Sequence, residues 1–292
     1  MKQLLTVVVA AALLLTSLLG GRVVLADDTP CTGFLGAVTV DNLVVPQNAS
    51  CTLDGTMVEG TIYVENGASL TAWRVRVDGN VQAEGAELVR VLTGSTVGGS
   101  IQLKQGGAAR VDKVDVDGDI QYESNAGAFS VTRNDVGGNI QIFQNTGGVD
   151  VVENTVDGNL QCKENFPAPT GGDNVVQGNK EDQCANLSPG DIIPPETTIL
   201  MGQAGTPRQG GLTISFTGND NVTPGFLLLF ECALGGAAFE VCDSPYEIPA
   251  GTEQSFQVRA LDLALNADPT PAIYSGPIVM PWRVYLPLVL RN

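Results

Sequence analysis

Histidine is absent from this sequence. Its absence excludes catalytic triads that pair serine or cysteine with histidine, as well as zinc sites that depend on imidazole. The six cysteines include no C-x-x-C pair, which argues against a structural zinc site. We therefore expect no metal, no cofactor and no catalytic residue, and we predict that the protein is not an enzyme.

Basic residues are scarce: Lys and Arg number 15 against 32 Asp and Glu, and the net charge is −17. A chain of this charge repels the phosphates of nucleic acids and the headgroups of anionic lipids. We exclude nucleic acid as a partner. The acidity is sufficiently explained as a property that keeps an exported protein in solution.

Long apolar runs are missing except near the start. The run from Leu4 to Leu19 is about 16 residues long, shorter than the ~20 that span a bilayer. It follows Lys2 and precedes Val24-Leu25-Ala26, the pattern of a secretory signal peptide with its cleavage site. We predict a signal peptide over residues 1–26, secretion with retention at the cell surface, and no transmembrane segment after cleavage.

A repeated phrase with a step of 19 or 20 residues occupies the chain between Val58 and Cys184. Each copy places a valine two residues before a glycine, and a small polar residue, an aliphatic residue and usually a glutamine follow. The glycines are Gly60, Gly79, Gly99, Gly118, Gly138, Gly158 and Gly178, and the glutamines are Gln82, Gln102, Gln121, Gln141 and Gln161. Apolar–polar alternation indicates strands with one buried face. Glycine marks a corner where a side chain would clash or φ must be positive.

The repeat length of 19 or 20 residues distinguishes between the known classes of repeat fold. Helix-pair repeats run to ~33 residues or more, and leucine-rich repeats need an L-x-x-L-x-L pattern that this valine-rich region lacks. We predict an all-β chain in which residues 31–186 form a right-handed parallel β-helix with coils of ~20 residues.

The six cysteines fall into three couples that are local in sequence. An even number in an exported protein favours disulfides, although six cysteines allow 15 connectivities. One couple precedes the repeat and another lies in its last coils, where a solenoid end needs covering. The expected couples are Cys31 with Cys51, Cys162 with Cys184, and Cys232 with Cys242.

The composition changes after Cys184. Residues 187–195 read LSPGDIIPP and form a proline-rich linker. Residues 196–278 carry short strand-like runs at about ten-residue spacing, which predicts a β-sandwich. Residues 279–292 remain as a C-terminal tail.

The second domain resembles the Ig-like module of bacterial surface proteins. In that family two cysteines bracket a hairpin, followed by an SPY turn and an F-x-V-R-A-x-D strand, and the modules serve as spacers or adhesive domains. The matching positions are Phe230, Cys232, Cys242, Ser244, Pro245, Tyr246, Phe256, Val258, Arg259, Ala260, Asp262, Asn266, Asp268 and Pro269.

Two further resemblances concern the repeat and the tail. The stretch from Gly158 to Cys184 is similar to the last coils of a secreted bacterial β-helix type, for which no catalytic motif is implied. The apolar segment from Trp282 to Asn292, with its basic end, resembles C-terminal sorting tags of bacterial surface proteins. A final strand of the sandwich is the alternative for this tail.

Many β-helix proteins are polysaccharide lyases or glycosidases, which use clustered carboxylates, sometimes with Ca²⁺ and a basic residue. The candidates here share or flank one column of the repeat: Glu59, Asp78, Asp117 and Asp157, with Asp115, Asp135, Lys113 and Arg133 nearby. Gly98 and Gly137 interrupt the column, and the coils lack long loops. A solvated outer face explains these acids more simply.

Two other groups of polar residues invite a functional interpretation. The glutamine column predicts a ladder of stacked amides, and it also offers an uncharged face for a glycan or a second rod. In the second domain, Asp220, Asp262, Asn266 and Asp268 could gather around Ca²⁺, whereas turn capping is the simpler role.

The sequence thus predicts a secreted, non-enzymatic structural or adhesive protein of the cell surface. Its expected partners are extracellular glycan or an envelope protein. The alternative is a carbohydrate-active β-helix, similar to a polysaccharide lyase or glycosidase and possibly calcium-dependent.

Overall fold

The structure is a computed structural model that describes residues 28–204, 212–248 and 255–274. The predicted signal peptide at 1–26 and the tail at 279–292 lie outside the described residues.

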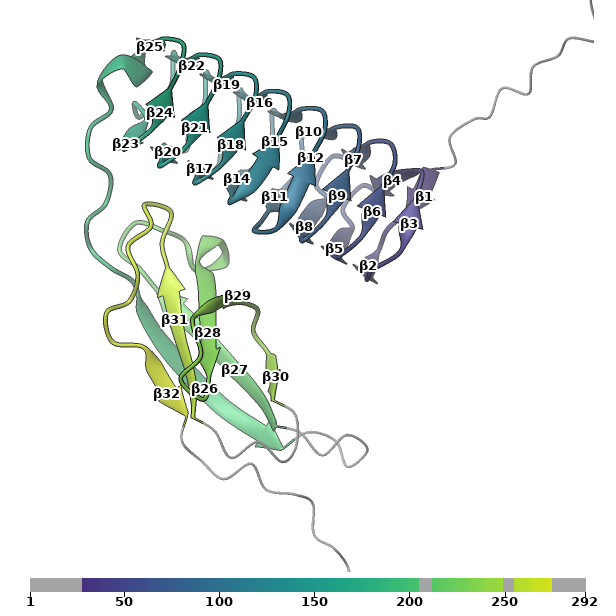
Figure 1. Cartoon of the computed structure of the whole chain (residues 1–292), viewed down its shortest axis with the longest axis vertical. Helices are drawn as coiled ribbons and strands as arrows, with labels where there is room; N and C mark the ends of the chain where they lie inside the picture. The colour runs from purple at the N-terminus through teal and green to yellow at the C-terminus, as the bar shows by residue number, and fades with distance from the viewer. Residues whose placement is uncertain (1–27, 205–211, 249–254, 275–292) are drawn as a thin grey trace, which may run out of the picture.

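The first part of the chain is a parallel β-solenoid built from three sheets (Figure 1). The first sheet contains β1 (Asp28–Pro30), β4 (Asn42–Val45), β7 (Ile62–Val64), β10 (Val81–Glu84), β13 (Ile101–Lys104), β16 (Ile120–Glu123), β19 (Ile140–Phe143), β22 (Leu160–Lys163) and β25 (Lys180–Asp182). The second contains β2 (Gly33–Leu35), β5 (Ser50–Asp54), β8 (Ser69–Trp73), β11 (Leu88–Val91), β14 (Ala108–Asp112), β17 (Phe129–Thr132), β20 (Val149–Val152) and β23 (Thr170–Gly172). The third contains β3 (Thr39–Val40), β6 (Met57–Val58), β9 (Arg76–Val77), β12 (Ser95–Val97), β15 (Val114–Val116), β18 (Asp135–Val136), β21 (Thr155–Val156) and β24 (Val175–Val176).

The apolar columns of the repeat form the interior, as the alternation predicts. Ile101, Ile120 and Ile140 pair in register on adjacent strands, and each is fully buried. The valine column is equally buried from Val58 to Val156, and only Val176 in the last coil is half-buried. The prediction of a parallel β-solenoid with coils of 19 or 20 residues is therefore confirmed.

The glycine column is required by close approach of neighbouring coils, because none of its members has a positive φ. A Cβ added to Gly138 would lie 2.3 Å from Asp119 Oδ1 and 2.7 Å from the Gly118 carbonyl oxygen. The adjacent polar column then closes the corner: Asp119 Oδ1 accepts hydrogen bonds from the backbone N–H and the Nδ2 of Asn139 at 2.6 and 3.0 Å.

We expect Gly138→Ala to destabilise the solenoid by roughly 1–3 kcal/mol, because the Gly118 carbonyl of the preceding coil cannot move aside without breaking the stack. Gly172→Ala is the matched control, since a Cβ there would meet nothing within 4 Å. Urea denaturation of both variants measures the difference. Equal stability of the two would contradict the close-approach explanation.

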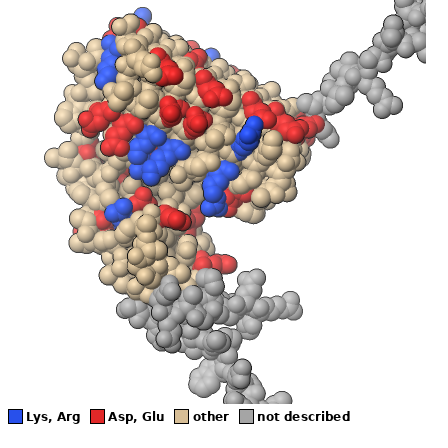
Figure 2. Space-filling model, viewed as in Figure 1, with Lys and Arg blue, Asp and Glu red and all other residues tan. Residues whose placement is uncertain are grey.

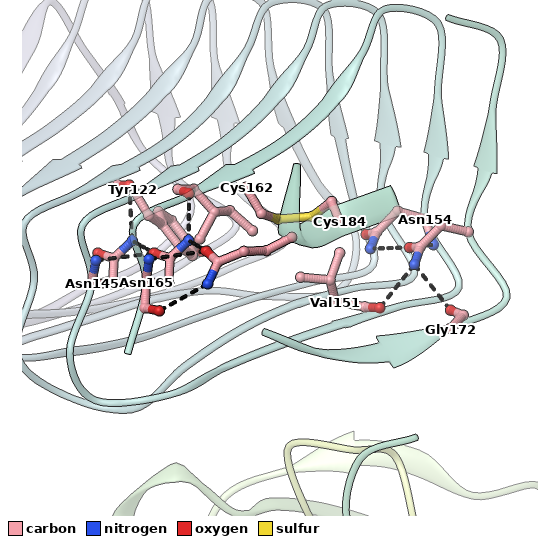
Figure 3. Close-up of a disulfide and its surroundings, with 11 residues drawn as sticks. Tyr122, Asn145, Val151, Asn154, Cys162, Asn165, Gly172 and Cys184 are labelled. Atoms are coloured by element: carbon pink, nitrogen blue, oxygen red, sulfur yellow. Dashed lines mark hydrogen bonds between the residues drawn. A yellow bond between two sulfur atoms is a disulfide. The ribbon is translucent and has the colours of Figure 1, made fainter. Parts of the chain in front are cut away.

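Two buried ladders of asparagine run inside the solenoid, which the sequence analysis missed. In one, Asn125 donates to Asn145, Asn145 to Asn165, and Asn165 to Gln183, at 2.9–3.0 Å. In the other, Asn134 donates to Asn154 and Asn154 to Asn174, at 3.0 and 2.9 Å. Figure 3 shows rungs of both ladders near the C-terminal end of the solenoid.

Each inner rung satisfies all its hydrogen-bonding atoms. Asn154 Oδ1 accepts from the backbone N–H and the Nδ2 of Asn134, while its Nδ2 donates to Asn174 and to the Val131 carbonyl oxygen. A buried amide is stabilising only when its whole network is satisfied. The ladders therefore fix the register of the coils from inside.

Disulfides lie at both ends of the solenoid. Cys31–Cys51 links the first coil to the second, and Cys162–Cys184 links β22 to the short 3-10 helix η2 (Gln183–Asn186) (Figure 3). Cys184 is 1% exposed, so η2 places its side chain over the apolar interior at the C-terminal end.

The second part of the chain contains two small antiparallel sheets, which we call the C-terminal sheets. One contains β26 (Glu196–Ala204), β27 (Leu212–Asn219) and β30 (Tyr246–Ile248). The other contains β28 (Leu229–Leu234), β29 (Glu240–Cys242), β31 (Phe256–Leu261) and β32 (Ala272–Tyr274). Phe216 and Ile248 from the first sheet share a core with Phe256 and Val258 from the second. The third disulfide, Cys232–Cys242, joins the neighbouring strands β28 and β29.

The C-terminal sheets pack against the outer face of the second solenoid sheet. Trp73 and Leu92 of the solenoid contact Leu229 and Leu261. The guanidinium of Arg110, which is fully buried, donates to the Leu227 carbonyl oxygen at 3.1 Å. The linker therefore joins two parts that share a buried contact. Within the described ranges, no helix has the length and apolarity needed to cross a bilayer.

Candidate functional site

The outer face of the first sheet carries an unbroken row of amides. Gln82, Gln102, Gln121, Gln141 and Gln161 each donate from Nε2 to the next side chain along the solenoid, at 3.3 to 2.7 Å, and the last acceptor is the carboxylate of Glu181. The glutamine column thus forms the predicted ladder. Each amide has a second N–H. Gln121 donates it to Asp119 at 3.3 Å, and the other rungs leave theirs for a ligand, with coils ~4.8 Å apart.

Tyr63 occupies the position before the first glutamine of this row. It pairs in register with Gln82, and its side chain is 41% exposed. A surface hollow lies around it, and Glu65, Gln102 and Lys104 are among its lining residues. This end of the face therefore combines an exposed aromatic ring, amides and charges of both signs. We call the surface formed by Tyr63 and the glutamine ladder the amide face.

The acidic column predicted as a catalytic alternative lies on the third sheet. Asp78, Asp115 and Asp117 line a second hollow there, together with Arg76 and Thr96. Arg76 Nε donates to Asp78 at 2.8 Å, and Asp157 accepts from Gln177. Figure 2 shows acidic side chains spread over the coils, with basic side chains among them.

Lys113 and Arg133, the basic residues expected near the acidic column, lie just before strands of the third sheet. Arg133 forms an ion pair with Asp112, which is fully buried, at 2.7 Å. Lys113 and Arg133 both adopt positive φ, at 55°. These residues therefore lie at the corner between the second and third sheets. For Arg133, the ion pair supports a structural role.

The acids proposed for the second domain separate into two sets. Asp268 accepts hydrogen bonds from the backbone N–H groups of Thr197 and Thr270 and from the Thr270 hydroxyl. Burial opposes ionisation of Asp268, but these hydrogen bonds prevail and hold its pKa below the ordinary value. Asp268 therefore has the capping role that the sequence favoured.

Asp220 and Asp262 instead meet a third acid, Asp191, which belongs to the linker and was not predicted. One carboxylate oxygen of each lies within 4.8 Å of the others. Burial, followed by the charges of Asp220 and Asp191, raises the pKa of Asp262 to about 6, against the opposing hydrogen bonds from Asn266. Among the described residues, no other three acids or cysteines gather so closely.

Comparison with protein-family models, with curated proteins and with solved structures found no match for this chain.

Proposed function

We propose that this chain is a secreted, non-enzymatic structural or adhesive protein of the cell surface, whose amide face contacts extracellular glycan. The observation that carries the proposal is the alignment of an exposed tyrosine with a regular row of amide donors. Sugars offer hydroxyls to such donors, and aromatic rings are frequent energetic anchors in binding sites.

The solenoid suits a mechanical role. Its stability comes from contacts between neighbouring coils, so a regular stack forms a stiff rod. Each end of the solenoid contains a disulfide. Three disulfides in the chain are consistent with an extracellular protein.

We assign the C-terminal sheets to the Ig-like class. Two packed antiparallel sheets and a disulfide across the β28–β29 hairpin support this assignment. In this proposal the module presents or spaces the rod at the surface of the cell, and an envelope protein is a second possible partner.

The hollow on the third sheet supports the second candidate, a carbohydrate-active protein. Asp78, Asp115 and Asp117 line it beside Arg76, and a pair of carboxyl groups is what most glycosidases use for cleavage. On the amide face, the carboxylates of Glu65 and Glu84 lie around the hollow beside Tyr63, and the glutamine ladder itself consists of amides up to Glu181. The two candidates therefore place function on different faces.

A glycan array tests the proposal through Tyr63. We expect the purified chain to bind at least one class of polysaccharide, and Tyr63→Ala to weaken that binding about tenfold, equivalent to ~1.4 kcal/mol. Val175→Ala is the control, because Val175 is 63% exposed on the third sheet. Equal binding by Tyr63→Ala and the unsubstituted chain would contradict the assignment to the amide face.

A further inference from the structure

Three carboxylates from three separate segments meet beside the junction of the two parts of the chain. Asp191 lies in the linker, Asp220 follows β27, and Asp262 follows β31. One oxygen of each lies within 4.8 Å of the other two. β26 and β27 separate Asp191 from Asp220, and β28 to β31 separate Asp220 from Asp262, so the fold, and not sequence proximity, brings the acids together.

Local hydrogen bonds aim two of these side chains into the cluster. Asp220 Oδ2 accepts from the backbone N–H groups of Val222 and Thr223 at 2.9 and 2.6 Å, and Asp191 Oδ1 accepts from that of Ile193 at 3.0 Å. The remaining oxygens, Asp220 Oδ1 and Asp191 Oδ2, are buried and have no hydrogen-bond donor. A buried acceptor without a donor is costly, which points to a missing positive partner.

Asp262 likewise has no ion-pair partner among the described residues. Its side chain is fully buried, and its two oxygens accept hydrogen bonds only from Asn266, at 2.8 and 2.6 Å. In the described part of the chain, no ion pair includes Asp191, Asp220 or Asp262. Arg110, the buried guanidinium on the solenoid side, is near enough for the Asp262 charge to act on its pKa, but it donates its hydrogen bond to the Leu227 carbonyl oxygen. One buried acid and two half-buried acids thus lie together without an ion pair, which is unfavourable.

We propose that Asp191, Asp220 and Asp262 form a calcium site that ties the linker to the C-terminal sheets. Ca²⁺ takes six to eight oxygen ligands and tolerates irregular geometry, so three loop carboxylates can be completed by carbonyl oxygens and water. Mg²⁺ demands near-ideal octahedral geometry and dehydrates reluctantly, which makes it the poorer occupant of a site assembled from loops.

An ion at this position would hold the linker in place between the solenoid and the C-terminal sheets. Asn266 Nδ2 donates both to Asp262 Oδ2 and to the Asp191 carbonyl oxygen, at 2.6 and 2.8 Å, so one side chain already spans linker and loop. Next to the site, a Cβ on Gly190 would lie 3.0 Å from Asp150 Oδ1 of the solenoid and 3.5 Å from Ala264 Cβ. A cation here fastens the linker where it passes between the solenoid and the C-terminal sheets.

Calorimetric titration of CaCl₂ into the purified, EDTA-treated full-length chain tests the site, together with thermal melts. We expect one Ca²⁺ with a dissociation constant of ~10⁻⁴–10⁻³ M, the range of extracellular calcium modules, a higher Tm with Ca²⁺, and weaker binding of Mg²⁺. Asp220→Asn should weaken Ca²⁺ binding at least about tenfold, because one charged ligand is lost. Asp173→Asn, at an exposed corner of the last solenoid coil, is the control and should bind Ca²⁺ as the unsubstituted chain does.

The melts separate a metal site from a merely structural cluster. Without Ca²⁺, Asp220→Asn should melt no lower than the unsubstituted chain, because asparagine retains the capping oxygen and removes like-charge repulsion. With Ca²⁺, the variant should lose the rise in Tm. Asp191→Asn removes the ligand that the linker contributes, and we expect the same loss of the Ca²⁺-dependent rise in Tm. Absence of heat and of a Tm shift in the unsubstituted chain would overturn the proposal, as would an undiminished Ca²⁺ response in both variants.

Discussion

Ile120→Asp is expected to unfold the solenoid. Ile120 is fully buried in β16, between Ile101 and Ile140 of the adjacent coils. A carboxylate at this position has no counter-ion or donor within the apolar interior, and such a burial costs at least ~4 kcal/mol. That loss is comparable with the whole stability of many domains, ~5–15 kcal/mol. We expect loss of the cooperative urea transition and of the native circular-dichroism spectrum.

Two controls isolate the effect of the buried charge. Ile120→Val should cost only ~0.5–1.5 kcal/mol, because it removes one methylene and keeps the apolar character. Gln121→Asp introduces the same carboxylate one residue later, on the half-buried outer face, and should leave the chain folded. A native-like Tm for Ile120→Asp would contradict the inward assignment of the aliphatic column.

Asn154→Ala is expected to destabilise the solenoid strongly, although it replaces a polar residue of the interior with an apolar one. The substitution removes the acceptor of the Asn134 backbone N–H and the donor to the Val131 carbonyl oxygen, and it breaks the ladder to Asn174. Each buried group left without a partner costs ~1–3 kcal/mol. We therefore expect a loss of about 3–5 kcal/mol in the free energy of unfolding, measured by urea denaturation.

Asn179→Ala is the matched control for the ladder. Asn179 is exposed at the end of the polar column, where its backbone N–H donates to Asn159 Oδ1. That hydrogen bond survives the substitution, so the change should stay within ~0.5 kcal/mol. Similar losses for Asn154→Ala and Asn179→Ala would show that the buried ladder contributes no special stability.

The sequence predicted the solenoid because its columns repeat. The valines, glycines and glutamines recur at one step, and each kind has a single physical role in a stacked coil. The interior asparagines escaped prediction because Asn125 and Asn145 each lie two residues before a glycine, in stretches that resemble turns. Their burial depends on the direction in which the side chains point at the corners of the coil, which residue type alone does not specify.

The periodicity of the sequence could not predict the contacts between the solenoid and the C-terminal sheets. Trp73 and Leu92 contact the C-terminal sheets, but their residue types do not recur at the same position in the other coils. No repeated column therefore predicts this contact surface. Asp191 was missed for a related reason. It lies in a proline-rich linker and meets Asp262 only after β26 to β31 have folded. The partners of such residues follow from tertiary structure, whereas the coil follows from local pattern.

The central claim is that the solenoid binds glycan on its amide face without cutting it. The most direct test incubates the purified chain with a polysaccharide that it binds on the array, with and without Ca²⁺, and measures both the bound fraction and the release of reducing or unsaturated chain ends. The account predicts binding that Tyr63→Ala weakens and no new chain ends. Chain ends that accumulate with the unsubstituted protein and disappear with Asp117→Asn would contradict it and assign the activity to the acidic hollow of the third sheet.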